Sequence, residues 1–149
     1  MATIQLPQDF KDFLRLLNLN KVEYLVIGGY AVSYYGYPRA TGDIDIWIAM
    51  DPQNAQRIVT VLSEFGFSKE HLSSELFLKE NQIIRMGMPP IRIELMTTIS
   101  GVAFKECYQS RVVDTIDGVE VSFINLADLK KNKKSAGRHK DLGDLESLP

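Results

Sequence analysis

Residues 24–48 decide the fold of this chain and carry the sequence YLVIGGYAVSYYGYPRATGDIDIWI. The apolar run 24–27 has the length of a buried strand and ends at Gly28-Gly29, which predicts a strand followed by a tight turn. A short helix over 30–35 follows. Residues 43–50 then alternate apolar and other side chains with a period of two, which predicts a second strand.

Asp43 and Asp45 are the most unusual feature of this second strand. Aspartate is depleted in strands, and the i, i+2 spacing puts both carboxylates on one face, with Cα atoms ~6.5 Å apart. Such a pair loses hydration and repels, and a divalent cation offsets both effects. Ligands that are all oxygen suit Mg²⁺ or Mn²⁺. The alternative is that both aspartates simply face water on an edge strand.

A third carboxylate, Glu94, lies on the polar side of the predicted strand 91–96. If this strand pairs beside the strand of Asp43 and Asp45, three acids converge. Three converging acids can hold two metal ions, which activate an attacking hydroxyl and stabilise a leaving pyrophosphate. Trp47 on the same face argues against a uniformly solvated surface.

Gly28 and Gly29 allow a ligand to approach the backbone, and the free amides of a helix start favour phosphate. The alternative is a turn without further function. Neither a G-x-G-x-x-G dinucleotide fingerprint nor a Walker A loop is present at this turn.

The remaining pattern alternates helices and strands, which predicts an α/β (α+β) domain with a single mixed β-sheet. Asp117-Gly118 is the best hairpin signal, Asp51-Pro52 and Asn125 are helix starts, and Gly66 and Gly137 are helix stops. The further helices are predicted over 9–19, 52–65, 102–108, 126–136 and 142–148, and the further strands over 76–78, 82–86, 111–116 and 119–124.

Composition narrows the class of protein. The chain has 149 residues, 45% hydrophobic and 24% charged, with a net charge of −2. These values predict one globular unit and argue against nucleic-acid binding through bulk positive charge. No apolar run has the ~20 residues of a membrane span, and we find no signal peptide, so we expect no membrane association and a cytoplasmic location. Cys107, His71 and His139 are too few for a structural zinc site.

The motif that joins a strand, Gly28-Gly29, 13 further residues and Asp43-Ile44-Asp45, with Glu94 on a later strand, resembles the polymerase-β-like nucleotidyltransferase superfamily. It is most similar to small bacterial stand-alone members related to abortive-infection nucleotidyltransferase toxins. The tail, residues 135–145, is similar to the closing helix of that group.

This resemblance implies one nucleotidyltransferase-like domain over 1–149, with a core of about 20–125, helices mainly on one face of the sheet, and a C-terminal helical segment 126–149. It also implies transfer of a nucleoside monophosphate from an NTP, for which we expect ATP, to a hydroxyl acceptor. Asp43 and Asp45 would bind Mg²⁺ (or Mn²⁺), and Glu94 would complete the metal site and act as the base. Gly28 and Gly29 would pack against the triphosphate.

Other polar residues have two interpretations each. Arg39, with Thr41 in the loop before the acids, either holds a triphosphate oxygen pair or is a surface arginine. The basic run 130–140 either forms a solvated helix face or faces the cleft and attracts phosphate. Asp141 and Asp144 lie one helical turn apart and can pair with these cations, which favours a structural role.

Several alternatives stay open at this level. The acceptor is a protein, a tRNA end or a small molecule. Gly29 replaces a serine that active members often have, and Glu94 an aspartate, so a binding module without turnover, such as a toxin–antitoxin component, is the second hypothesis. A phosphodiesterase or nuclease is the third. The clustered tyrosines either pack in the core, form a homodimer surface or stack on a base; they are Tyr30, Tyr34, Tyr35 and Tyr37.

Overall fold

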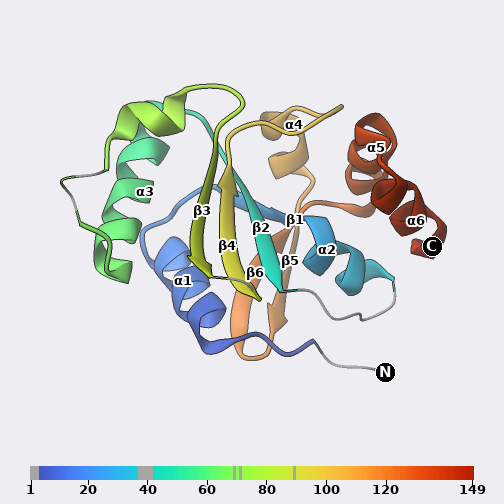
Figure 1. Ribbon diagram of the computed structural model, residues 1–149, viewed down its shortest axis with the longest axis horizontal. Coiled ribbons are helices and arrows are strands. Elements are labelled where there is room, and N and C mark those ends of the chain that lie inside the picture. Colours follow the sequence, from blue (N-terminus) through green and yellow to red (C-terminus); the bar gives the residue numbers. More distant parts are fainter. Residues whose placement is uncertain (1–3, 37–41, 69, 71, 89) are drawn as a thin grey trace.

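The computed structural model describes residues 4–36, 42–68, 70, 72–88 and 90–149, and its centre is a six-stranded mixed sheet in the order β3-β4-β2-β1-β6-β5 (Figure 1). The strands are β1 Tyr24–Ile27, β2 Asp43–Ile48, β3 Ile83–Met88, β4 Ile91–Met96, β5 Val112–Ile116 and β6 Val119–Phe123. The helices are α1 Gln8–Leu19, α2 Gly28–Tyr35, α3 Pro52–Phe65, α4 Phe104–Gln109, α5 Leu126–Ala136 and α6 His139–Ser147, with a 3-10 helix, η2, over Ser74–Leu78. The predicted α/β class with one mixed sheet is confirmed.

The predicted helix starts and stops coincide with capping contacts. Asp51 accepts a hydrogen bond from the backbone N–H of Asn54 at 2.9 Å, and Asn125 accepts one from the N–H of Asp128 at 2.7 Å. Gly137 ends α5 in the left-handed conformation, with φ +65°. These local contacts satisfy backbone groups that a helix end leaves unpaired.

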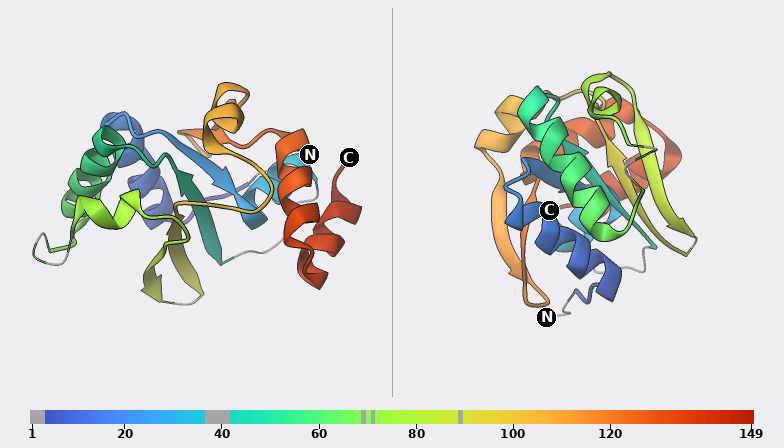
Figure 2. Two further views of the ribbon diagram at one scale, coloured as in Figure 1. Left: turned by 90° about the horizontal axis from the view of Figure 1, so that it is seen from above. Right: turned by 90° about the vertical axis from the view of Figure 1, so that its left-hand side faces the viewer.

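Helices α1 and α3 cover one face of the sheet (Figure 2). Leu14 of α1 lies with Val26 and Ile44 around a small apolar cavity. Ile93 is the register partner of Ile44 and lines a second apolar cavity with Phe65 of α3. The intervening residues of β2 and β4 therefore point to the opposite face, because side chains alternate along a strand.

One predicted strand is wrong. Residues 76–78 belong to the 3-10 helix η2, in which Ser73 accepts a hydrogen bond from the N–H of Glu75 at 3.3 Å. Phe77 is fully buried, so the apolar run did report burial, but a run of three residues cannot distinguish an extended from a turned backbone.

Several boundaries of helices and strands in the structure also differ from the predicted ones. The strand predicted over 82–86 is Ile83–Met88, the strand 43–50 ends at Ile48, the helix predicted to begin at 30 begins at Gly28, and the last helix begins at His139. Arg39 and Thr41, as well as Tyr37 and His71, lie outside the described residues, so their predicted roles stay predictions.

Within the described part of the chain, no helix is both long and apolar enough to cross a bilayer.

Candidate active site

The register of β2 and β4 brings the three acids together. The two strands are parallel neighbours in which Asp45 is opposite Glu94 and Asp43 is opposite Arg92. The hypothesis that the strand of Glu94 pairs beside that of Asp43 and Asp45 is therefore confirmed. Strands in a sheet are ~4.8 Å apart, so the carboxylates of Asp45 and Glu94 share one small volume.

Asp45 is the electrostatic centre of this group. Burial, the negative charge of Glu94 and a hydrogen bond with Glu94 raise the pKa of Asp45 from 3.8 to about 6. The positive charge of Lys140 acts in the opposite direction and favours the ionised form. Close to neutral pH the pair of Asp45 and Glu94 thus holds negative charge in a largely buried position.

Gly28 is in direct contact with the side chain of Asp45. Ile27, the last residue of β1, is the register partner of Asp45, and Gly28 follows with φ +65°. A Cβ atom at Gly28 would lie 2.2 Å from Oδ2 of Asp45. Both the backbone conformation and the lack of space require glycine at this position, and the turn is therefore packed against the acidic site.

These residues line a cleft of about 850 Å³. Its acidic wall comes from the sheet, with Gly28 and Gly29 at the edge. The opposite wall comes from α5, the start of α6 and the loop after β4, and contributes Ser100, Asn132, Lys133, Arg138 and Lys140. The structure thus places Gly28, Gly29, Asp43, Asp45 and Glu94 in the lining of one cleft, and their predicted roles stay predictions.

Two arginines beside the acids were missed in the sequence. Arg92 binds Asp43 through both Nη2 and Nε, at 3.0 and 3.3 Å, and its Nη2 lies 3.7 Å from Oε1 of Glu94. Arg85 of β3 is opposite Glu94 and binds Oε1 through Nε at 3.2 Å. The period of two was the available signal, because it places Arg92 and Glu94 on one face.

The arginines change the charge balance at the acids. Among the described residues, no three histidine, cysteine, aspartate or glutamate side chains already form a metal-binding group. Each of Asp43 and Glu94 has a guanidinium as its counter-ion instead.

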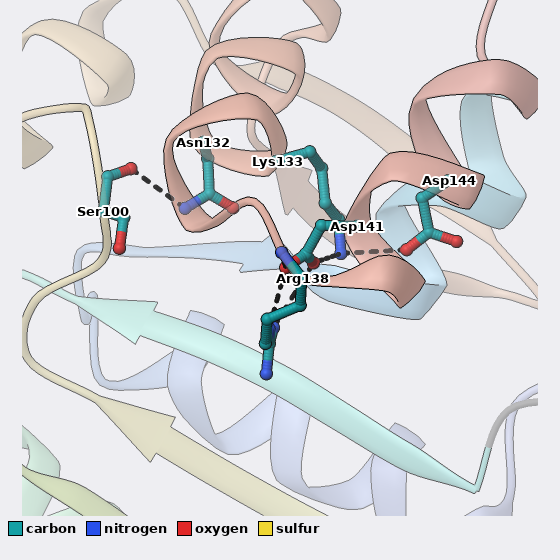
Figure 3. Close-up of polar contacts among 6 residues, drawn as sticks. All are labelled: Ser100, Asn132, Lys133, Arg138, Asp141 and Asp144. Carbon is teal, nitrogen blue, oxygen red and sulfur yellow. Dashed lines mark hydrogen bonds and ion pairs between the residues drawn. The ribbon is translucent and has the colours of Figure 1, made fainter.

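The basic run 130–140 is not uniform. Lys133 is 3% exposed, and its Nζ lies 3.2 Å from Asp141 and 3.0 Å from Asp144 (Figure 3). The predicted pairing of the two aspartates with preceding cations is confirmed. The solvated-face interpretation is wrong for Lys133, whereas Lys134 on the same helix is exposed.

The tyrosines of α2 serve packing, as one of the three interpretations predicted. The hydroxyl of Tyr34 donates to Asp114 at 2.7 Å and its ring stacks on Phe123, while the hydroxyl of Tyr35 donates to the carbonyl of Ile124 at 2.6 Å. Tyr30 is buried. Base stacking by these three tyrosines has no support in the cleft lining.

The chain is similar to known proteins over nearly its whole length. Residues 4–148 match the family model described as "Nucleotidyltransferase of unknown function (DUF6036)". The chain belongs to this nucleotidyltransferase family. No curated protein matches it.

Solved structures of nucleotidyltransferase-like proteins share the fold, among them the following two. One is the crystal structure of "a putative nucleotidyltransferase (TM1012) from Thermotoga maritima", with a TM-score of 0.62 and 17% identity over 92% of this chain and 88% of the other. The second is "an antigenic nucleotidyltransferase-like protein from Paracoccidioides brasiliensis", with a TM-score of 0.55 and 16% identity over 93% of this chain and 72% of the other. At these identities the similarity shows the nucleotidyltransferase fold alone.

Proposed function

We propose that this family member transfers a nucleoside monophosphate from an NTP to a hydroxyl acceptor. The observation that carries the proposal is the β2–β4 register, which sets Asp45 opposite Glu94 beside the Gly28-Gly29 turn in one cleft. Family membership supports the same class of reaction. ATP is our expected nucleotide, the acceptor is a protein, a tRNA end or a small molecule, and a cytoplasmic setting agrees with the single free cysteine.

The donor chemistry of the acids fits Mg²⁺ or Mn²⁺. Asp43, Asp45 and Glu94 offer only oxygen ligands, and burial and then the charge of Glu94 raise the pKa of Asp45, so its ionised form would be stabilised by a bound cation. Arg92 has to release Asp43 before this carboxylate can bind a metal ion. When bound, the metal supplies charge neutralisation at the phosphates and lowers the pKa of the attacking hydroxyl.

The residues of the chain then have separate roles. The acceptor oxygen attacks the α-phosphorus and forms a new P–O bond, while the bond between the α-phosphorus and the bridging oxygen breaks and pyrophosphate leaves with both electrons. Glu94 takes the proton of the acceptor hydroxyl. The turn at Gly28 and Gly29 is expected to present backbone N–H groups to the phosphates beside the acids, so that positioning and electrostatics provide most of the rate enhancement.

Label transfer tests this function. The protein is incubated with each of the four α-³²P-labelled NTPs, Mg²⁺ and cell lysate. We expect a labelled product that is lost in Glu94→Gln and retained in Glu120→Gln, which changes an exposed glutamate on β6. Absence of label with every NTP, or equal labelling by both variants, would overturn the proposal.

A second candidate is a binding module of the same fold without turnover, such as a toxin–antitoxin component. The arginine pairs favour it, because Arg92 and Arg85 already neutralise two of the three acids. Label transfer distinguishes the two, because only the enzyme gives a labelled product, and thermal melting tests whether the acids hold a metal ion. Mg²⁺ with ATP should raise the melting temperature of the wild type and leave that of the Asp43→Asn/Asp45→Asn double variant unchanged if the acids hold a metal.

A further inference from the structure

The wall of the cleft that faces the acids carries positive charge. Arg138 precedes α6 and Lys140 lies in its first turn, and both line the cleft that contains Asp43, Asp45 and Glu94. The charges of Arg138 and Lys140 each interact with Asp45. The cleft therefore lies between two walls. The acidic wall is formed by Asp43, Asp45 and Glu94 on the sheet, and the cationic wall by Arg138 and Lys140 at the start of α6.

Buried ion pairs fix this cationic wall. Lys133 of α5, Asp141 and Asp144 of α6 are all at most 3% exposed, and the Lys133 ammonium contacts both carboxylates (Figure 3). A buried ammonium is strongly destabilising unless opposite charges surround it. Because its two partners come from the next helix, the buried Lys133 ammonium links α6 to α5.

Asp141 connects the buried lysine to the exposed arginine. Its Oδ2 accepts from Nε of Arg138 at 2.7 Å and from the backbone N–H of Arg138 at 3.2 Å, while its Oδ1 accepts from Lys133. The side chain of Arg138 is nonetheless 68% exposed. The guanidinium is thus held at one end by Asp141 and open to the cleft, which suits an anionic ligand.

Helix α5 is in turn attached to the loop that follows β4. Nδ2 of Asn132 donates to the carbonyl of Ser100 at 3.0 Å. A Cβ atom at Gly101 would lie 2.6 Å from Cβ of Ser135, so the loop and the helix are in close contact. The loop that follows the strand of Glu94 is therefore in direct contact with the helix that carries Lys133.

We propose that Arg138 and Lys140 bind the polyphosphate of the substrate, and that Lys133 is a positioning residue that holds them across the cleft through Asp141 and Asp144. This inference rests on the proposed function, because it assigns the phosphate-binding half of the same site. A polyphosphate between the two walls places its negative charge against Arg138 and Lys140 and leaves the acids for a cation.

Inorganic tripolyphosphate in metal-free buffer tests the cationic wall independently of the acids. Calorimetric titration should give binding to the wild type that is weakened about tenfold in Lys140→Gln and in Arg138→Gln, since a charge-assisted contact contributes about that much. Arg138→Lys should lose less, because it keeps the charge. Lys134→Gln, the matched control on the exposed side of α5, should bind like the wild type. No binding by the wild type, or equal losses in Lys134→Gln and Lys140→Gln, would overturn the assignment.

Lys133→Met tests the positioning role while Arg138 and Lys140 remain in place. We expect faster hydrogen exchange over residues 139–147 and a loss of tripolyphosphate affinity like that of Arg138→Gln, with unchanged Mn²⁺ affinity at the acids by electron paramagnetic resonance. Loss of both affinities would indicate general unfolding and contradict a positioning role, as would unchanged tripolyphosphate affinity. Label transfer is measured separately, so a protein that binds tripolyphosphate without turnover would disprove the proposed function alone.

Discussion

Gly28 and Asp45 are in contact across the β1–β2 pair, so closely that a methyl group on the glycine would overlap the carboxylate at 2.2 Å from Oδ2. The turn that is expected to approach phosphate and the acid that is expected to approach metal are therefore parts of one packed unit. A substitution at either residue should therefore shift the position of the other.

Gly28→Ala should destabilise the fold by about 2–4 kcal/mol, because alanine at φ +65° is strained and its methyl group displaces Asp45. Urea unfolding measures the loss. Gly143→Ala is the matched control: Gly143 lies within α6 with nothing within 4 Å of its added Cβ, so alanine should stabilise that helix by about 0.5–1 kcal/mol. Equal effects of the two substitutions would contradict the contact.

Asp45→Asn should stabilise the protein at pH 7.5 while it removes activity. The pKa of Asp45 is raised to about 6 in the folded state, so the folded protein binds a proton more readily than the unfolded chain, and stability falls as pH rises from about 4 to 6. Asparagine is neutral and can still donate to Glu94. We expect a gain on the order of 1–2 kcal/mol at pH 7.5 that vanishes below pH 4.

Urea unfolding at both pH values checks this, with Asp12→Asn as the control that removes an exposed carboxylate of α1. If Asp45→Asn is less stable than the wild type at pH 7.5, the charge of Asp45 does not destabilise the folded state and the prediction is wrong.

Arg92→Gln should strengthen the binding of Mn²⁺ in the absence of nucleotide. Arg92 holds Asp43 through two nitrogens at 3.0 and 3.3 Å and therefore competes with a metal ion for this carboxylate. We expect an affinity about tenfold higher by electron paramagnetic resonance, as for the loss of one charged hydrogen-bonded competitor. Arg111→Gln removes an arginine away from the acids and should leave Mn²⁺ binding unchanged. Weaker binding by Arg92→Gln would show that the guanidinium supports the site.

The contacts of Asp141 should stabilise α6 down to a lower pH than a carboxylate with an ordinary pKa would allow. Burial would raise the pKa of Asp141, but the hydrogen bonds from Arg138 and Lys133 outweigh it and lower the value to about 2. This stabilisation is complete above the unfolded pKa of about 4 and is lost as pH falls toward 2. The difference in unfolding free energy between wild type and Asp141→Asn should accordingly shrink over that interval. A difference that is constant from pH 6 to pH 2 would contradict the ion pairs of Asp141.

Local patterns predicted most of the elements and the acidic half of the site. These features each depend on a short-range constraint that one segment satisfies by itself. They are the spacing of Asp43 and Asp45, Gly28 at the end of an apolar run, and Asn125 before a helix. The pairing with Glu94 was a conditional prediction, because the order of strands in a sheet depends on contacts between distant segments.

What the sequence did not predict depends on register and packing. Arg92 and Arg85 acquire their roles only when β4 lies between β2 and β3, and Lys133 differs from Lys134 only once α5 is packed against α6. The 3-10 helix at 74–78 was missed because three apolar residues are too few to define a period.

The arrangement of charge across the cleft has a consequence for how such a protein can diverge. The acids belong to strands near the middle of the fold, whereas Arg138 and Lys140 lie at the start of its last helix. Substitutions on that helix can therefore alter which anions are accepted without disturbing the carboxylates, and a lineage can explore new substrates while it inherits the same acidic centre.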